Sequence, residues 1–198
     1  MLPIGDQNTS RKTTPIITFI FIILNLIGFY LELVNGEAFI ERWAFVPNRF
    51  LANPSGEFIT LFTSMFMHAG WLHLGGNMLY LWIFGDNVEH RFGHIKFILF
   101  FLLSGIAAAF AQMAISGGSD VPFLGASGAI AGVLGAYILL FPVNKVRVLL
   151  GLWVIHLPAV VVIGVWILIQ FFSGLGSISS TAQTGGVAYV AHVGGFLA

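Results

Sequence analysis

The sequence contains no cysteine and very few charged residues. Without cysteine the chain can form no disulfide, no thiolate metal site and no cysteine nucleophile. Asp, Glu, Lys and Arg together make up 8% of the 198 residues, whereas soluble domains carry about 25%. So few polar groups could not cover a soluble surface, so a soluble enzyme, a nucleic-acid-binding protein and a disordered chain are excluded. The 8 basic and 8 acidic residues cancel, so the net charge implies no electrostatic partner.

Apolar residues take the place of the missing charges. Hydrophobic residues make up 58% of the chain and 20 residues are Phe, and the mean hydropathy is +0.94. A membrane-spanning helix needs about 20 mostly apolar residues, and we therefore expect an all-α membrane protein, a bundle of six helices. The expected spans are residues 15–34, 70–88 (with 60–67 leading into it), 94–115, 127–141, 146–172 and a sixth that begins near Val187.

The remaining features of the chain complete this expectation. Residues 1–14 are a short polar segment, and residues 15–198 form the membrane domain. Pro158 is expected to kink the fifth span. The sixth span stops at Ala198 after about half its length, and because a half-helix is implausible in a bilayer, we expect the sequence to be truncated within it.

Basic residues are distributed unevenly between the two sides of the membrane. With the N-terminus inside, the outer loops hold Arg42 and Arg49. The cytoplasmic segments hold Arg11, Lys12, Arg91, Lys96, Lys145 and Arg147. Because cytoplasmic loops are enriched in Lys and Arg, we expect a multi-pass protein of the cell membrane with both termini in the cytoplasm.

Four polar side chains are expected at a similar depth within the spans. His73 and Asn77 lie four residues apart and so share one helix face. Ser127 begins the fourth span, and His192 lies about five residues into the sixth. All these spans enter from the outer face, so the four side chains should converge just below it. Polar residues within spans are costly and are typically functional.

This combination of side chains is suited to acyl transfer. A serine hydroxyl becomes a nucleophile when a base removes its proton, and His192 is placed to act on Ser127. The resulting oxyanion needs hydrogen-bond donors, and these are available from the Ser127 backbone and the side chains of His73 and Asn77. The small-residue pairs Gly128/Gly132 and Ala191/Gly195 would let the fourth and sixth spans pack closely enough for this contact.

The order and spacing of these residues resemble the rhomboid family of intramembrane serine proteases. The matching motifs are His68-x4-His73-x3-Asn77, Val88-Glu89-x-Arg91-x-Gly93, Gly125-x-Ser127-Gly128 and Ala191-His192-x-x-Gly195. The resemblance implies a six-helix rhomboid protease domain over residues 15–198. It also implies that no metal, nucleotide or other cofactor is needed.

The resemblance further implies a role for each matching residue. Ser127 and His192 would form a catalytic dyad without a third acid. The oxyanion hole would comprise His73, Asn77 and the Ser127 amide, with His68, Gly125 and Gly128 as supporting residues and Glu89, Arg91 and Gly195 as structural ones. At Ala131, many rhomboids have an aromatic residue that stacks on the catalytic histidine.

The implied partners are the lipid bilayer and single-span membrane proteins. The substrates would be cut near the outer end of their transmembrane helix, with the active site towards the outer face of the membrane. The fifth span and the loop after it would act as a lateral gate.

Three other interpretations of the polar cluster stay open. One is a transporter or channel in which buried histidines relay protons, although the cluster is confined to one depth. Another is a metal site formed by His68, His73 and His192, although no carboxylate lies nearby on these spans. The third is a catalytically weak or inactive rhomboid-like protein that binds client transmembrane helices, although the chain carries both the serine and the histidine.

A labelling experiment tests the orientation, and the absence of native cysteine removes any background. Single cysteines in the outer loop of residues 35–57 should react with a membrane-impermeant thiol reagent applied to intact cells. A cysteine beside Lys145 should react only after the membrane is permeabilised. The reverse pattern would place the polar cluster on the cytoplasmic side.

Overall fold

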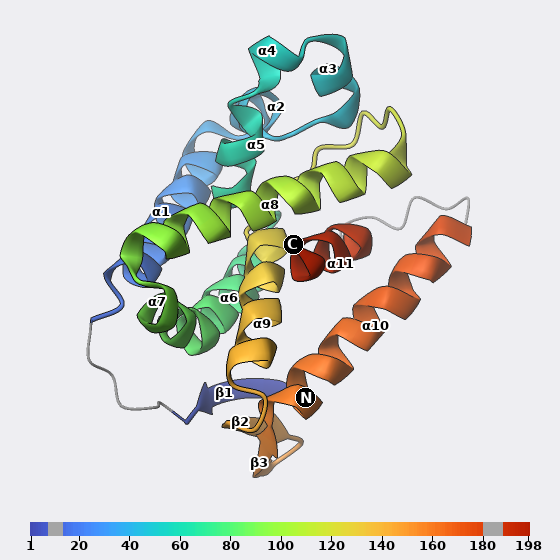
Figure 1. Cartoon of the computed structure of the whole chain (residues 1–198). Helices are drawn as coiled ribbons and strands as arrows, with labels where there is room; N and C mark the ends of the chain where they lie inside the picture. Colours follow the sequence, from blue (N-terminus) through green and yellow to red (C-terminus); the bar gives the residue numbers. More distant parts are fainter. Residues whose placement is uncertain (8–13, 180–187) are drawn as a thin grey trace.

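The long helices form a membrane-spanning framework in the computed structural model, which describes residues 1–7, 14–179 and 188–198. Three helices are long and apolar enough to cross a membrane, and a fourth apolar helix, α9, is shorter. Their bounds are α1 (Ile16–Asn35), α8 (His94–Ser116), α10 (Ala159–Ser179) and α9 (Ser127–Leu140), with α11 (Tyr189–Leu197) following near the end of the chain (Figure 1). The expected helical membrane protein is thereby confirmed, and the count of six spans and the truncation of the sixth stay predictions.

The second expected span is one continuous helical rod with a change of winding in its middle. It consists of α6 (Trp71–Tyr80), the π turn η2 (Leu81–Gly85) and α7 (Asp86–Phe92). Short helices precede it: α2 (Glu37–Trp43), α3 (Pro47–Ala52), α4 (Pro54–Glu57), α5 (Thr60–Thr63) and the 3-10 turn η1 (Ser64–Phe66). The expected loop after the first span is therefore largely helical, and it lies at the opposite end of the molecule from the β-sheet (Figure 1).

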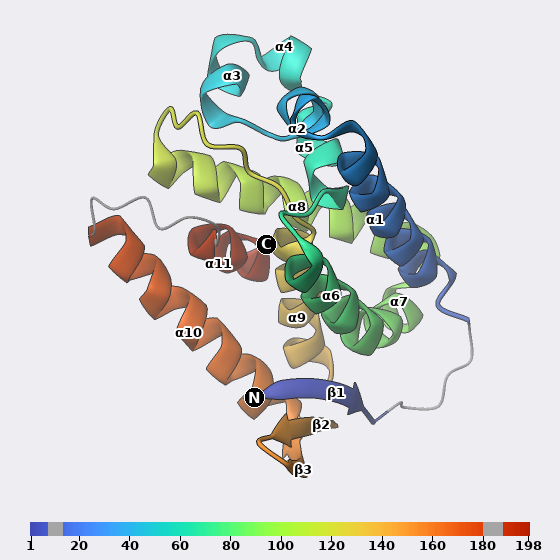
Figure 2. The same ribbon diagram turned by 180° about the vertical axis from the view of Figure 1, so that it is seen from behind.

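Residues 145–158 fold as a β-hairpin, which corrects the expected start of the fifth span at residue 146. β2 (Lys145–Leu150) pairs antiparallel with β3 (Trp153–Pro158) and, along its other edge, with β1 (Leu2–Asp6). Gly151 in the turn has a φ of +60°, which glycine adopts without strain. Alternate side chains of β2 are buried, as the period of two in a strand requires. Figure 2 shows this sheet below the ends of α9 and α10.

Pro158 ends β3 and does not kink the fifth helix, which begins at the next residue, Ala159. A proline lacks the backbone N–H group, and it disfavours helical conformation in the residue before it. The residue therefore marks a boundary between strand and helix. The expected fifth span includes the hairpin because the apolar residues of the hairpin continue directly into α10.

Some expectations fall on residues outside the described part of the chain. These are Arg11 and Lys12, two of the basic residues used for the orientation, and the expected start of the sixth span near Val187.

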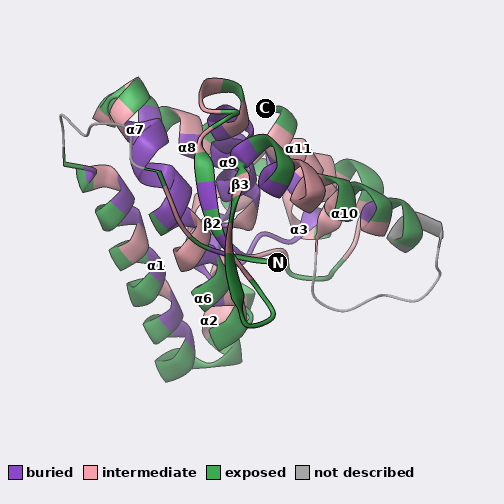
Figure 3. Cartoon of the chain, turned by 90° about the horizontal axis from the view of Figure 1, so that it is seen from below, coloured by how far each residue is buried: buried purple, intermediate pink, exposed green. Residues whose placement is uncertain are grey.

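The helix α1 shows how the fold separates its core from its lipid-facing surface. Its buried side chains recur every three or four residues: Thr18, Phe21, Asn25, Phe29 and Glu32. The Phe21 ring stacks on Phe101 of α8 with ring centroids 4.4 Å apart. The other positions of α1 are mostly exposed (Figure 3). Many of them carry large aliphatic side chains, and such a surface suits contact with lipid.

The Glu89 carboxylate on α7 caps the N-terminus of α1. It accepts hydrogen bonds from the backbone N–H groups of Ile17 (2.9 Å) and Thr18 (2.7 Å) and from the Thr18 hydroxyl (2.7 Å). The Nδ1 atom of His94 lies 2.6 Å from the same carboxylate. The first N–H groups of a helix have no acceptor within it, and buried Glu89 supplies one. Arg91, which the resemblance implies to be structural, is exposed.

Removing this cap should destabilise the fold. In Glu89→Ala two backbone N–H groups and the Thr18 hydroxyl lose their acceptor, and each buried group left unpaired costs about 1–3 kcal/mol. We expect the free energy of unfolding to fall by about 2 kcal/mol or more, measured as a lower midpoint of thermal unfolding in detergent. Glu37→Ala, at an exposed position in the first turn of α2, is the matched control and should change it by less than about 0.5 kcal/mol. Equal midpoints for the two variants would contradict the capping role.

Candidate active site

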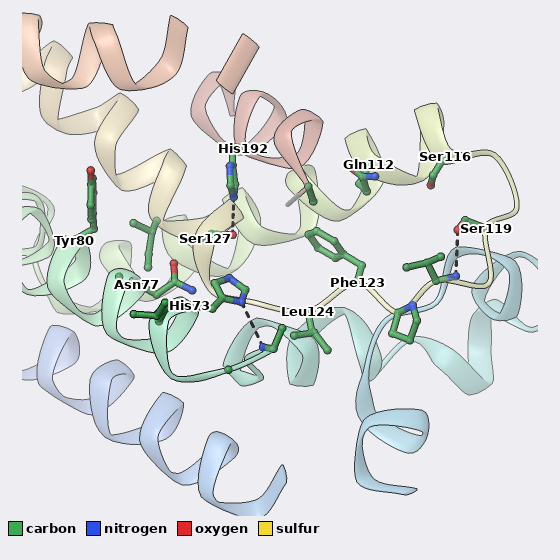
Figure 4. A pocket seen from close by; sticks show the side chains of 18 of the residues that line it. His73, Asn77, Tyr80, Gln112, Ser116, Ser119, Phe123, Leu124, Ser127 and His192 are labelled. Carbon is green, nitrogen blue, oxygen red and sulfur yellow. Dashed lines mark hydrogen bonds between the residues drawn. The ribbon is translucent and has the colours of Figure 1, made fainter. Parts of the chain in front are cut away.

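A cavity of about 880 Å³ opens between α6, α8, α9, α10 and α11. Its wall includes all four polar residues that the sequence predicted to converge, and Figure 4 shows them facing one another. They are His73 and Asn77 from α6, Ser127 from α9 and His192 from α11. Three helices far apart in the sequence therefore build one site.

Ser127 is the first residue of α9, and the loop before it is held in place by Gly125. Gly125 has a φ of +127°, a conformation that favours glycine, and its N–H group donates to the carbonyl of Ser64 (2.8 Å). A Cβ atom at Gly125 would lie 2.7 Å from Cε1 of His73. Glycine is therefore required for both the turn and the contact with the His73 ring.

The helices α8, α9 and α11 meet with almost no side chain between them. A Cβ atom at Gly195 of α11 would collide with the carbonyl oxygen of Gly128 on α9. A Cβ atom at Gly132 would collide with Ser104 of α8, and one at Gly194 with Ala111 of α8. The two small-residue faces named in the sequence thus contact each other. This contact carries the first turn of α11, with His192, up to Ser127.

The side chains of Ser127 and His192 form a direct hydrogen bond. Oγ of Ser127 lies 2.8 Å from Nε2 of His192 (Figure 4). His192 is 9% exposed, so this contact is largely shielded from the surroundings. A serine hydroxyl within hydrogen-bond reach of an imidazole has the geometry of an activated nucleophile.

Two side chains of α10 contact the His192 ring. Oε1 of Gln170 lies 2.7 Å from Nδ1 of His192. The Trp166 ring lies beside the imidazole, with centroids 5.7 Å apart and planes 35° apart. Many rhomboids have an aromatic residue at the position of Ala131. Ala131 is completely buried and provides no aromatic ring. The aromatic contact therefore comes from α10.

His73 and Asn77 present hydrogen-bond donors to the cavity. Nδ1 of His73 accepts a bond from the backbone N–H of Ala69 (3.4 Å), which leaves Nε2 as the donor of the neutral ring. Asn77 is buried, and its Nδ2 atom has no hydrogen-bond partner among the described residues. The backbone N–H of Ser127, in the first turn of α9, has no acceptor within its own helix.

His68 is buried beside His73 and does not line the cavity. Their rings make an edge-to-face contact with centroids 5.1 Å apart. The backbone N–H of His68 donates to both carboxylate oxygens of Glu32 on α1, at 3.0 and 3.1 Å. Glu32 therefore anchors the segment that leads into α6, and His68 packs against the ring of His73.

The histidines of the site do not form a metal-binding cluster. Across the described ranges, no three His, Cys, Asp or Glu side chains come together in a way that could hold a metal ion. The proposed ligands are already engaged differently: His68 packs on the edge of His73, and His192 faces Ser127 and Gln170.

Sequence reasoning missed three residues that touch or support this site: Glu32, Trp166 and Gln170. Gln170 and Glu32 carried a usable signal, because a polar side chain in an otherwise apolar span is costly and needs a partner. Trp166 carried none, because an aromatic residue in a membrane helix is ordinary. The partner of each residue could not be predicted, because it depends on how α10 and α1 pack against the rest of the protein.

The sequence is similar to a known protein family and to several of its members. Residues 55–198 match the family model of the Rhomboid domain. The chain is 34% identical to Rhomboid protease GluP of Bacillus subtilis over 142 residues, which cover 66% of this chain and 27% of that protein. It is 34% identical to Rhomboid protein 1, mitochondrial, of Saccharomyces cerevisiae over 145 residues, 69% of this chain and 38% of the relative. It is 42% identical to RHOMBOID-like protein 6, mitochondrial, of Arabidopsis thaliana over 81 residues, 38% of this chain and 24% of the relative.

The chain thus spans less than two thirds of the length of each of these relatives. The family match nevertheless covers the greater part of the chain, including every residue that lines the cavity from α6, α8, α9, α10 and α11. The motifs, the helical membrane fold and the match agree, and this chain belongs to the rhomboid family.

Proposed function

We propose that this protein is an intramembrane serine endopeptidase with a Ser127–His192 dyad. Its substrates would be single-span membrane proteins, cut near the outer end of their transmembrane helix. The observation that carries this proposal is the 2.8 Å contact between Oγ of Ser127 and Nε2 of His192 in a cavity that also contains His73 and Asn77. One relative, from Bacillus subtilis, is itself named a rhomboid protease, which supports the same activity here.

The acylation step follows from this contact. As Oγ of Ser127 attacks the carbonyl carbon of the substrate, Nε2 of His192 takes the hydroxyl proton. The tetrahedral intermediate collapses when the imidazolium gives that proton to the leaving amide nitrogen. An ester on Ser127 and a free amine result. In the deacylation step His192 takes a proton from the water that attacks the ester, and returns it to Oγ of Ser127 as the carboxylic acid leaves.

Three donors on the cavity wall would stabilise the oxyanion. They are Nε2 of His73, Nδ2 of Asn77 and the backbone N–H of Ser127. The unpaired Nδ2 of buried Asn77 supports this role, because a buried amide without a partner costs free energy that an incoming oxyanion would recover. Fixed donors of this kind stabilise the transition state without reorganising.

The substrate must reach the cavity as an unwound segment. The backbone of a transmembrane helix is fully hydrogen-bonded, so its carbonyl carbons are inaccessible to Ser127. Glycine and proline weaken helices by about 1 and 3 kcal/mol respectively. We therefore propose that substrates carry such residues close to the cleavage site. The cavity wall includes Pro47, Trp71 and Pro122, from segments assigned to the outer side, which supports cleavage near that surface.

A covalent probe tests the dyad directly. The purified protein in detergent should react with a fluorophosphonate at one residue, Ser127, because its hydroxyl has an imidazole base positioned beside it. Ser127→Ala should abolish the label, and His192→Ala should reduce it by about 10²–10⁴-fold, the usual contribution of a general base. The same variants should fail to cleave a single-span model substrate. Labelling would be located by mass spectrometry and its rate followed by fluorescence.

Each outcome of this experiment separates the candidate functions. Normal labelling of the His192 variant would remove His192 as the base. A folded wild-type protein that neither labels nor cleaves, in detergent or in lipid, would reject the endopeptidase. If a transmembrane peptide still bound to that protein, the result would favour the alternative function, an inactive rhomboid-like protein that binds client helices.

The oxyanion hole makes a second prediction. Loss of one such donor typically lowers kcat by about 10²–10³-fold, and we expect losses of this size for Asn77→Ala and for His73→Ala in the cleavage assay. Asn35→Ala and His156→Ala are matched controls at exposed positions outside the cavity, and they should retain wild-type rates. An unchanged kcat in Asn77→Ala would exclude Asn77 from the oxyanion hole.

A further inference from the structure

The helix α10 holds the His192 ring through two side chains on one of its faces. Trp166 and Gln170 are four residues apart in α10, so they lie on the same face. Both contact the imidazole: Gln170 at Nδ1, at 2.7 Å, on the opposite nitrogen from Ser127, and Trp166 beside the ring. Neither residue belongs to the motifs that identify the site.

The contact with Gln170 selects the tautomer of His192. A neutral imidazole carries one N–H group and one lone pair, and the hydrogen bond at one nitrogen decides which nitrogen is protonated. With Oε1 of Gln170 accepting from Nδ1–H, the lone pair is on Nε2, 2.8 Å from Oγ of Ser127. Only this tautomer can remove the serine proton. If the other tautomer formed, Nε2–H would point at Oγ and the base would be lost.

The contact with Trp166 restricts the plane of the ring. A histidine held at its two nitrogens alone can still tilt about the line that joins them. Trp166 lies against the ring at 5.7 Å between centroids, and Ala131 on α9 supplies no aromatic surface. Packing from α10 therefore does what a ring at residue 131 would otherwise do.

A neutral acceptor also suits the surroundings of the site. A carboxylate inside a membrane protein is costly unless it is paired, whereas an amide needs only hydrogen bonds. Gln170 orients the ring and still stabilises the imidazolium through the dipole of its carbonyl group. The other titratable side chains on the cavity wall are His73 and Tyr80, and neither carries a negative charge at neutral pH.

We propose that Gln170 is the positioning residue of the catalytic base, with Trp166 holding the plane of the ring, so that α10 completes a Ser127–His192–Gln170 relay of hydrogen bonds. The effects expected on reaction rates rest on the proposed protease function. The tautomer of His192 is a property of the resting protein and can be read whether or not the protein is active.

Two substitutions at residue 170 distinguish positioning from simple packing. Gln170→Met keeps the length of the side chain and removes the acceptor. We expect it to lower kcat and the fluorophosphonate labelling rate about 10- to 100-fold, part of the contribution of a general base, with KM changed less than about threefold. Gln170→Glu keeps an acceptor, so its rate should exceed that of Gln170→Met. Its negative charge favours the imidazolium, so the acid limb of the pH–rate profile should move to higher pH. Ile169→Met introduces the same side chain at an exposed position of α10 and should match the wild type.

A spectroscopic measurement completes the test. In protein labelled with ¹⁵N-histidine, the His192 signals, assigned by their loss in His192→Ala, should show Nδ1 protonated and Nε2 unprotonated. Gln170→Met should give a mixture of tautomers or the reverse one. A wild-type labelling rate together with an unchanged tautomer in Gln170→Met would overturn the positioning role. An inactive wild-type protein with the expected tautomer would reject the protease function alone.

Discussion

The contact between the backbones of α9 and α11 is the constraint on which the rest of the site depends. Lipid is as apolar as leucine, so helices in a membrane associate through close packing more than through a hydrophobic driving force. At Gly128 and Gly195 there is no room even for a Cβ atom. The helix α11 packs on α8, α9 and α10. The distance between Ser127 and His192 is therefore set by glycines.

Two buried carboxylates tie α1 to the helical rod that carries His73 and Asn77. Glu89 on α7 accepts the N–H groups at the start of α1, and Glu32 near the end of α1 accepts the N–H of His68, just before α6. One carboxylate thus reaches from α7 to the start of α1, and the other reaches from the end of α1 to the segment just before α6. Because an unpaired backbone group in the membrane costs several kcal/mol, they fix both the height and the rotation of α1 relative to α6.

Much of the site could be predicted from the sequence because topology alone brought its residues to one depth. Ser127 and His192 each stand near the start of a helix, as the expected spans placed them, and His73 and Asn77 share a helix face by spacing. The hairpin of residues 145–158 was missed because an unbroken apolar run does not distinguish strand from helix, although Gly151 and Pro158 marked its turn and its end. Gln170 was missed because its significance is in its partner: only the packing of α10 against α11 shows that it faces His192.

The π turn at Leu81–Gly85 separates α6, which lines the cavity, from α7, which contacts the start of α1. Before the turn, α6 must direct His73 and Asn77 towards the cavity. After the turn, α7 must direct Glu89 towards α1. A regular helix advances by about 100° per residue, whereas a π turn closes its hydrogen bond one residue later, so it changes the angle between whatever stands on either side. Shortening this turn by a single residue would wind the rod into a regular helix and swing Glu89 by about 100° relative to Asn77. The five residues of the turn thus set the angle between α6 and α7, and buried Leu81 and Phe84 hold the turn in the core.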